Sequence, residues 1–182
     1  VCPFEELVPE IRATGGRLLD YGCGAGLFGL HCVGQEYVEA VDGVDINATA
    51  VAAADAARQS SPRADSVRFQ VGEPPEASYE SISMIDVMHH VGPADQQSTF
   101  LDLCARLAPG GVLVYKDMCL RPRWRALANR LHDLILNRQW IHYVPFEDVI
   151  AWAGQAGLTL LRRTHFNYLV YGHELAVFRR VG

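Results

Sequence analysis

Residues 17–29 read RLLDYGCGAGLFG, and this stretch decides the fold. An apolar strand over residues 18–21 runs into a turn that contains Gly22, Gly24 and Gly26, and the apolar start of a helix follows the turn. Glycine accepts a positive φ angle and lets a ligand lie against bare backbone amides. A helix N-terminus behind the turn adds unpaired N–H groups and a favourable dipole. The stretch therefore predicts a cradle for a ligand.

The strand, its acid Asp20 and the three glycines resemble the first motif of the class I, seven-stranded, S-adenosylmethionine-dependent methyltransferases, which reads D/E-x-G-x-G-x-G after an apolar strand. Residues 24–29 also match the dinucleotide-binding pattern G-x-G-x-x-G. In that alternative, Asp20 would be poorly placed beside an anionic pyrophosphate. A cofactor with a cationic amino group and a sulfonium suits an acid at this position. We favour the methyltransferase interpretation, and nucleotide binding and a purely structural turn stay open as alternatives.

Composition places the chain among globular, intracellular proteins. Its 182 residues are 49% hydrophobic and 20% charged, which suits one domain with a full core. No apolar run approaches the roughly 20 residues of a transmembrane helix, and the start shows no secretory signal. Five cysteines without a C-x-x-C pair predict a reducing, cytoplasmic location, and we expect no metal site. A net charge of −5 disfavours nucleic acid as a partner.

Helical and strand patterns alternate along the chain, which predicts a parallel sheet covered on both faces. Expected strands cover residues 18–21, 40–46, 67–71, 81–85, 112–115, 158–163 and 174–179. Expected helices cover residues 4–13, 26–33, 48–59, 95–107, 122–137 and 146–155. Residues 164–172 are too few for a helical crossover, so the last two strands should be antiparallel. The sequence predicts one α/β, Rossmann-like domain over residues 1–182, with a seven-stranded, mostly parallel sheet.

Asp45 is the predicted ribose ligand. It ends the second strand in the sequence GVDIN, where a carboxylate can accept hydrogen bonds from both ribose hydroxyls. Ile46 is placed to pack on adenine, and the family resemblance implies that Gly72 and Glu73, after the third strand, contact the adenine amino group. The predicted cofactor-binding residues are Asp20, Gly22, Cys23, Gly24, Gly26, Asp45, Ile46, Gly72, Glu73 and Asp86.

Residues 85–91 read IDVMHHV and resemble the family's D-V-x-H-H stretch, which borders the methionine end of the cofactor and the substrate. Asp86 either caps the following turn or contributes to the chemistry. Histidine titrates near neutral pH, so either His89 or His90 is a candidate base for an acceptor hydroxyl or amine. Because the two are adjacent, one of them must face inward, where a satisfied core histidine is the expected fate.

Residues 116–143 look like an insert, and the family resemblance implies that a segment at this position covers the acceptor site. Residues 121–138 carry five arginines and a single acid, Asp133. The arginines either are solvated, or recognise an anionic acceptor such as a carboxylate or phosphate, or lie on an anionic membrane that supplies a lipid-like acceptor. The predicted substrate-binding residues are Lys116, Asp117, Arg125, Arg130 and Tyr143.

Together these motifs predict methyl transfer from S-adenosylmethionine to a small-molecule acceptor. The leaving group of this displacement is a neutral thioether, so the enzyme mainly supplies proximity and alignment, which contribute about 7 to 11 kcal/mol when the geometry is ideal. Two alternatives stay open. A catalytically idle module would bind S-adenosylhomocysteine without turnover, and a nicotinamide-dependent oxidoreductase would bind NAD.

Overall fold

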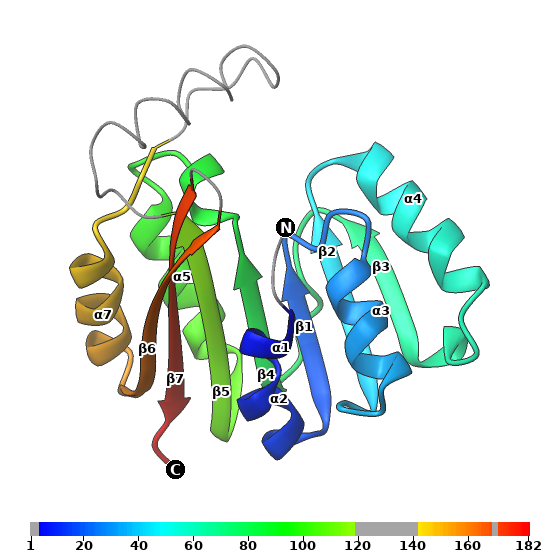
Figure 1. Ribbon diagram of the computed structural model, residues 1–182, viewed down its shortest axis with the longest axis horizontal. Coiled ribbons are helices and arrows are strands. Elements are labelled where there is room, and N and C mark those ends of the chain that lie inside the picture. The colour runs from blue at the N-terminus through cyan, green and yellow to red at the C-terminus, as the bar shows by residue number, and fades with distance from the viewer. Residues whose placement is uncertain (1–3, 119–141, 169–170) are drawn as a thin grey trace.

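The computed structural model describes residues 4–118, 142–168 and 171–182. Within these residues one seven-stranded sheet has the order β3-β2-β1-β4-β5-β7-β6 (Figure 1). Strands β1 to β5 are parallel, and β7 runs antiparallel to both β5 and β6. The predicted fold class and the antiparallel final pair are confirmed. The strands are β1 (Arg17–Tyr21), β2 (Ala40–Asp45), β3 (Val67–Val71), β4 (Tyr79–Ile85), β5 (Leu107–Met118), β6 (Leu158–Tyr168) and β7 (Tyr171–Arg180).

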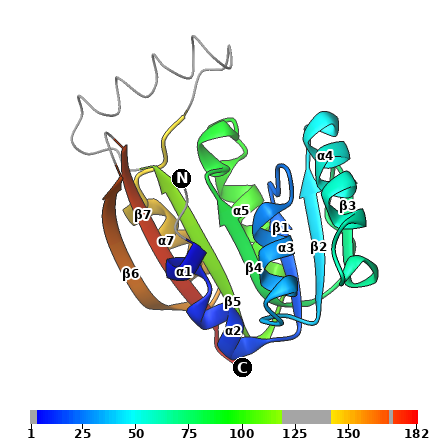
Figure 2. The same ribbon diagram turned by 45° about the vertical axis from the view of Figure 1, so that its right-hand side comes forward.

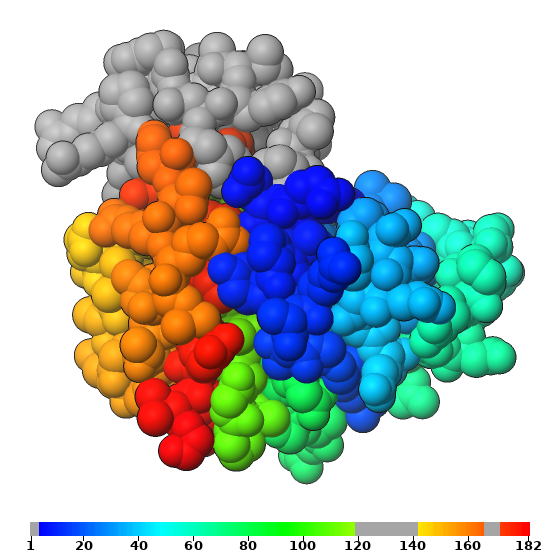
Figure 3. Space-filling model, turned by 60° about the horizontal axis from the view of Figure 1, so that its bottom comes forward, coloured from blue at the N-terminus to red at the C-terminus, as the bar shows by residue number. Residues whose placement is uncertain are grey.

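Helices cover both faces of the sheet, as Figures 1 and 2 show. On one face lie α1 (Phe4–Leu7), α2 (Pro9–Thr14), α3 (Leu27–Gly34) and α4 (Ala48–Gln59). On the other lie α5 (Gln96–Ala105) and α7 (Phe146–Gln155), and short 3-10 turns occupy Ala64–Ser66 and Met88–His90. In Figure 3 the N-terminal helices (blue) lie between β6 (orange) and α3 (light blue). An ion pair of 2.8 Å between Arg162 Nε and Glu10 Oε1 fastens them to β6.

The central strand β1 is apolar on both sides because each side packs in a different hydrophobic core. Leu18 packs in the core beneath α2 and α3, whereas Leu19 packs in the core beneath α5 and α7. Both side chains are fully buried, and burial of such a side chain contributes about 1.5 to 3 kcal/mol. This two-sided burial explains why the strand reads as an apolar run rather than as an alternation.

The expected first helix, residues 4–13, is wrong in one respect, because it is two helices. The break falls at Val8, and Pro9 opens α2 at its first turn, a position where the missing proline N–H leaves no helical hydrogen bond unmade.

The expected boundaries of the fifth strand are also wrong, because β5 is longer at both ends. Residues 108–111, which separate the expected helix from the expected strand, belong to β5 as an irregular segment. Tyr79 of β4 pairs with Leu107, but Ser81 pairs with Val112, so the intervening residues bulge. At its far end β5 continues to Met118. The last hairpin likewise extends through residues 164–168, which were expected to form a connection. The predicted helix at residues 122–137 lies outside the described residues.

Candidate active site

A cavity of about 670 Å³ lies at the carboxyl ends of β1, β2, β3 and β4. The strand order reverses between β1 and β4: β2 and β3 lie on one side of β1, and β4 and β5 lie on the other. Open α/β sheets bind ligands at such a switch point, and the volume lies in the usual range for a small-molecule site. The predicted site residues that line it are Gly22, Asp45, Ile46, Gly72, Glu73, Asp86 and His90.

The glycine turn is fastened to the end of β2 by three backbone amides. The N–H groups of Gly22 and Cys23 donate to the Val44 carbonyl at 2.8 and 3.0 Å, and Gly24 N–H donates to Asp45 Oδ2 at 2.9 Å. These contacts join the turn and the predicted ribose ligand into one rigid unit.

Different constraints require glycine at the three positions of the turn. Their φ angles are +73°, +52° and +74° for Gly22, Gly24 and Gly26, the left-handed region. A Cβ at Gly22 would lie 2.2 Å from Val87, and one at Gly26 would lie 2.5 Å from Phe69. A Cβ at Gly24 would meet no atom within 4 Å. The outer two glycines therefore serve packing, and Gly24 leaves open space in front of the turn.

Asp45 is held in place and still has room for a ligand. Its Oδ1 accepts the Asn47 N–H at 2.8 Å, and its Oδ2 accepts the Gly24 N–H. Asn47 in turn caps α4 by accepting from Thr49 N and Ala50 N. A carboxylate offers about four lone-pair sites, so two remain for hydroxyl donors. Ile46, next in the chain, is 86% exposed beside the cavity.

Four of the predicted cofactor residues do not line the cavity: Asp20, Cys23, Gly24 and Gly26. Asp20 is 3% exposed, and its Oδ1 accepts a hydrogen bond of 2.8 Å from the Ser83 hydroxyl. Burial raises the pKa of Asp20 to about 6, against the lowering effects of Ser83 and the Gly29 backbone. Burial likewise raises the pKa of Cys23 to about 12, so this thiol stays neutral.

Gly72 and Glu73 do reach the cavity from the end of β3. The Gly72 N–H donates to the Asp45 carbonyl at 3.0 Å, and Gln70 Nε2 donates to the Glu73 carbonyl at 2.6 Å. The loop is therefore tied to β2 and β3, while the Glu73 side chain is exposed. Its contact with adenine stays a prediction.

Asp86 binds Lys116 rather than capping the following turn. Lys116 Nζ contacts Asp86 Oδ2, and Lys116 is 1% exposed. Asp86 has a φ angle of +56°, uncommon for a residue with a side chain, and its N–H donates to the Lys116 carbonyl at 2.8 Å. His173 Nδ1 lies 4.0 Å from Asp86 Oδ1. Burial, and then the Lys116 charge, lowers the pKa of His173 to about 4, so this ring is neutral near pH 7.

The adjacent histidines divide as expected, one inward and one outward. His89 is 2% exposed, and its Nδ1 lies 2.5 Å from Asp117 Oδ1. The His89 N–H donates to Asp117 Oδ2 at 3.2 Å, and the Tyr115 hydroxyl donates to the same oxygen at 3.4 Å. His90 is exposed and lines the cavity, with its ring centroid 4.1 Å from that of His89.

The predicted substrate residues are only partly described. Lys116 and Asp117 belong to β5 and are buried in the contacts given above, and neither lines the cavity. Tyr143 is half-buried, with its hydroxyl 4.0 Å from the Met118 sulfur at the end of β5. Arg125 and Arg130 lie outside the described residues.

Sequence reasoning missed the residues that support this site from neighbouring strands and helices. Ser83 and Tyr115 contact Asp20 and Asp117 from buried positions. Gln96, at the start of α5, donates to the carbonyls of Met88, Val91 and His142. The one available signal for Gln96 was a polar residue on the apolar side of a predicted helix.

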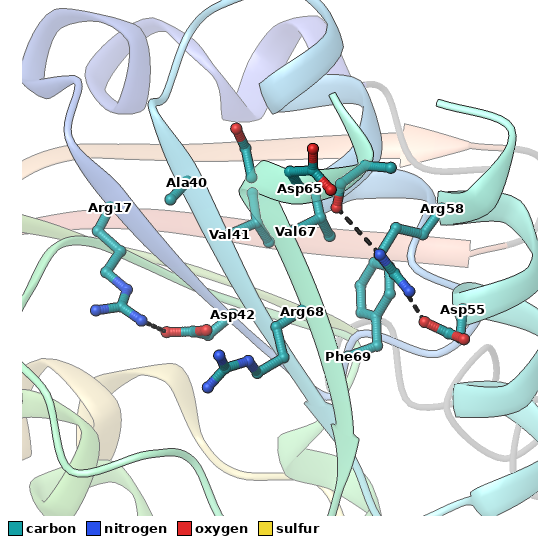
Figure 4. A pocket seen from close by; sticks show the side chains of 12 residues that line it. Arg17, Ala40, Val41, Asp42, Asp55, Arg58, Asp65, Val67, Arg68 and Phe69 are labelled. Carbon is teal, nitrogen blue, oxygen red and sulfur yellow. Dashed lines mark hydrogen bonds and ion pairs between the residues drawn. The ribbon is translucent and has the colours of Figure 1, made fainter. Parts of the chain in front are cut away.

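A second cavity, of about 480 Å³, lies at the opposite, amino end of β1, β2 and β3. Figure 4 shows that most of the charged side chains lining this cavity form ion pairs with one another. Arg17 binds Asp42 at 2.7 Å, and Arg58 binds Asp55 at 2.7 Å. Asp42, the other acid of β2, is therefore structural.

The described residues hold neither a metal-ligand cluster nor a membrane-spanning helix. His, Cys, Asp and Glu side chains nowhere gather there in a group of three or more that could hold a metal ion. None of the helices described combines the length and apolar composition that a bilayer crossing requires.

The strand order, the antiparallel last strands and the glycine turn after β1 define the class I methyltransferase fold. The chain belongs to the methyltransferase-domain family, because the model described as "Methyltransferase domain" matches residues 3–163. S-adenosylmethionine is the methyl donor that this family uses.

Individual relatives agree with this assignment. The chain is 30% identical over 149 residues to a ubiquinone biosynthesis O-methyltransferase of Maricaulis maris, a match over 78% of this chain and 53% of that protein. The chain thus spans about half the length of this curated relative.

Two solved structures share the fold. An O-methyltransferase family protein from Burkholderia thailandensis superposes with a TM-score of 0.78 at 15% identity, over 98% of this chain and 55% of that one. Magnesium protoporphyrin IX methyltransferase from Synechocystis PCC 6803, with bound S-adenosylhomocysteine (SAH), gives 0.77 at 17% identity, over 97% and 80%.

Proposed function

We propose that this protein binds S-adenosylmethionine in the cavity at the carboxyl ends of β1 to β4 and transfers its methyl group to a small-molecule acceptor. The observation that carries the proposal is the convergence of three features on one cavity. These are the glycine turn, the carboxylate of Asp45 and the imidazole of His90.

The order of the strands suggests how the cofactor is oriented. Asp45 at the end of β2 takes the ribose hydroxyls, and Ile46 with the loop after β3 takes adenine. The remaining, methionine part then lies over β1 and β4, where the glycine turn and Asp86 border the cavity. Asp86 and His90, which both line the cavity, would then border the reactive methyl group.

S-adenosylmethionine supplies an electrophilic methyl group when bound. The chain's own residues align the acceptor with it, and His90 takes the proton that a hydroxyl acceptor must lose. The buried His89–Asp117 pair holds the turn on which His90 lies. The name of the curated relative, an O-methyltransferase, supports oxygen as the accepting atom.

The acceptor's charge class depends on the insert. Lys116 already contacts Asp86, so recognition of an anionic acceptor would fall to arginines such as Arg125 and Arg130. Arg125→Ala and Arg130→Ala should then raise the acceptor KM without changing the affinity for SAH. Salt-dependent sedimentation with anionic vesicles would instead indicate a lipid-like acceptor on a membrane surface.

Calorimetric titration with SAH, followed by a screen for methyl transfer to metabolite fractions, tests the proposal. Binding of SAH and transfer of labelled methyl from S-adenosylmethionine are the expected results. Binding without transfer to any fraction would favour an idle cofactor-binding module. Binding of NAD in place of SAH would favour an oxidoreductase and overturn the proposal.

A further inference from the structure

Gln96 is a buried polar side chain that joins three separate parts of the chain. It is the first residue of α5 and is 7% exposed. Its Nε2 donates to the carbonyls of Met88 at 3.3 Å, Val91 at 3.2 Å and His142 at 2.8 Å. One amide group thus connects α5, the turn after β4 and the segment that leads into α7.

The acceptors of this amide enclose the two adjacent histidines of the turn. Met88 precedes the histidine pair in the chain, and Val91 follows it. The His142 N–H also donates to the His89 carbonyl at 2.8 Å. Carbonyls before, within and after the pair are therefore held by Gln96 or by the segment that Gln96 binds, so the turn cannot shift without breaking these contacts.

An uncharged side chain with more than one donor suits this place. A glutamine amide carries two N–H donors, and the three carbonyls share them. A glutamate of the same shape would present oxygen atoms to carbonyl oxygens. A lysine would bring a charge, which is costly away from water. The contacts therefore explain why a buried position of α5 holds glutamine.

The backbone around His90 is held on both sides. Side chains of β5 hold the turn at His89 and at Asp86, which both precede His90 in the chain. Gln96 holds the carbonyl of Val91, which follows it. The side chain of His90 lines the cavity between these fixed points.

Resting on the function proposed above, in which His90 takes the proton of a hydroxyl acceptor, we propose that Gln96 is a positioning residue for His90. Gln96 does not line the cavity, so it acts through the turn. Proton transfer requires a base within about 2.6 to 3.2 Å of its partner, and a displacement of about 1 Å can lower the rate about 100-fold. Loss of Gln96 should therefore slow methyl transfer. It should not weaken cofactor binding, because the glycine turn and Asp45 follow β1 and β2.

The test compares Gln96→Met with Gln97→Met. Methionine is unbranched and flexible like glutamine but has no N–H donor, so it removes the hydrogen bonds while still filling the space. Gln97 is the matched control, because it is the next residue of α5, is exposed and donates to Gln155 Oε1 at 3.1 Å.

Two quantities are measured on each whole chain. Calorimetry gives the affinity for SAH, and a dilution series of the metabolite fraction that accepts labelled methyl gives the maximal rate. Gln96→Met should lower the maximal rate by about 10- to 100-fold with the SAH affinity and the half-saturating dilution unchanged. Gln97→Met should match the unaltered protein in all three.

A second comparison separates positioning of His90 from a general defect. In His90→Ala no imidazole is left to position, so adding Gln96→Met should lower the remaining rate by less than about twofold. A general loss of folded protein would lower the rate by the same factor in both backgrounds. NMR spectra of the histidine rings, recorded with SAH present, need no acceptor. The His90 ring signals should shift or double in Gln96→Met and stay unchanged in Gln97→Met.

A full maximal rate in Gln96→Met, equal fractional losses in the two backgrounds, or unchanged His90 ring signals would overturn this inference and leave methyl transfer standing. Gln96→Glu keeps the shape of glutamine and serves the same comparisons if Gln96→Met does not fold. Failure of the unaltered protein to bind SAH or to methylate any fraction would instead remove the proposed function. The ring signals would then still decide whether Gln96 sets the position of His90.

Discussion

His89 Nδ1 lies 2.5 Å from Asp117 Oδ1, and this buried pair joins the turn after β4 to the end of β5. The preceding residue of β5, Lys116, contacts Asp86 at the start of the same turn. Neighbouring strand residues thus hold the turn at two points through side chains of opposite charge. His90 follows directly, so the two pairs fix a histidine that lines the cavity.

Removing one member of the buried His89–Asp117 pair should lower the free energy of unfolding substantially. Asp117→Ala leaves His89 and the Tyr115 hydroxyl without their acceptor, and breaking a buried charged pair typically costs about 3 to 5 kcal/mol. Urea unfolding monitored by circular dichroism measures the loss. Asp55→Ala, which breaks an exposed pair with Arg58, is the control and should change stability far less. Equal stability of Asp117→Ala and the unaltered protein would contradict the role of the pair.

Asp45→Ala should weaken SAH binding while the protein stays folded. Loss of charge-assisted hydrogen bonds to ribose should cost about 1.5 to 3 kcal/mol, or roughly 10- to 100-fold in affinity. Calorimetry measures this change. Asp65→Ala is a matched control, because Asp65 lies by the second cavity at the other end of the strands. An unchanged SAH affinity in Asp45→Ala would refute the ribose assignment.

The glycines of the turn should separate binding from folding. Gly24→Ala meets no protein atom but forces alanine to a φ of +52°, at a stability cost of about 1 to 2 kcal/mol. It should weaken SAH binding strongly, since the new methyl group occupies the open side of the turn. Gly26→Ala clashes with Phe69 and should mainly destabilise the fold. Thermal melts and calorimetry on both variants check this contrast, and normal SAH affinity in Gly24→Ala would contradict the cradle argument.

The sequence predicted the parts of this site that depend on short-range pattern. The glycine spacing and the position of Asp45 at a strand end both follow from a few neighbouring residues. The partners of Asp20 and His89 were not predictable in the same way. Ser83 lies 63 residues from Asp20, and Asp117 lies 28 residues from His89, so only the register of adjacent strands brings them together. The bulge in β5 was missed for a related reason, because Pro-Gly-Gly after a helix is typical of a turn.

Asp20 should make stability depend on pH in the direction opposite to an ordinary salt-bridged aspartate. Its pKa is raised from 3.8 to about 6 in the folded protein, so the folded state binds more protons than the unfolded state between these values. Stability from this group is complete below about pH 4 and is lost as the pH rises through about 6. Asp20→Asn should therefore stabilise the protein by up to about 3 kcal/mol at pH 7 and by almost nothing at pH 4. Urea unfolding at both pH values measures the difference, and a variant that is less stable at pH 7 would contradict it.

His90 should be needed for turnover but not for cofactor binding. If it takes a proton from the acceptor, His90→Ala should lower kcat by about 10² to 10⁴-fold with SAH affinity unchanged. The acid limb of the pH–rate profile should disappear in the same variant. His165→Ala, at an exposed histidine on β6, is the control and should keep full activity. Full activity in His90→Ala would remove this histidine from the mechanism and would indicate an acceptor that needs no base, for which alignment with the methyl group is the whole of the catalysis.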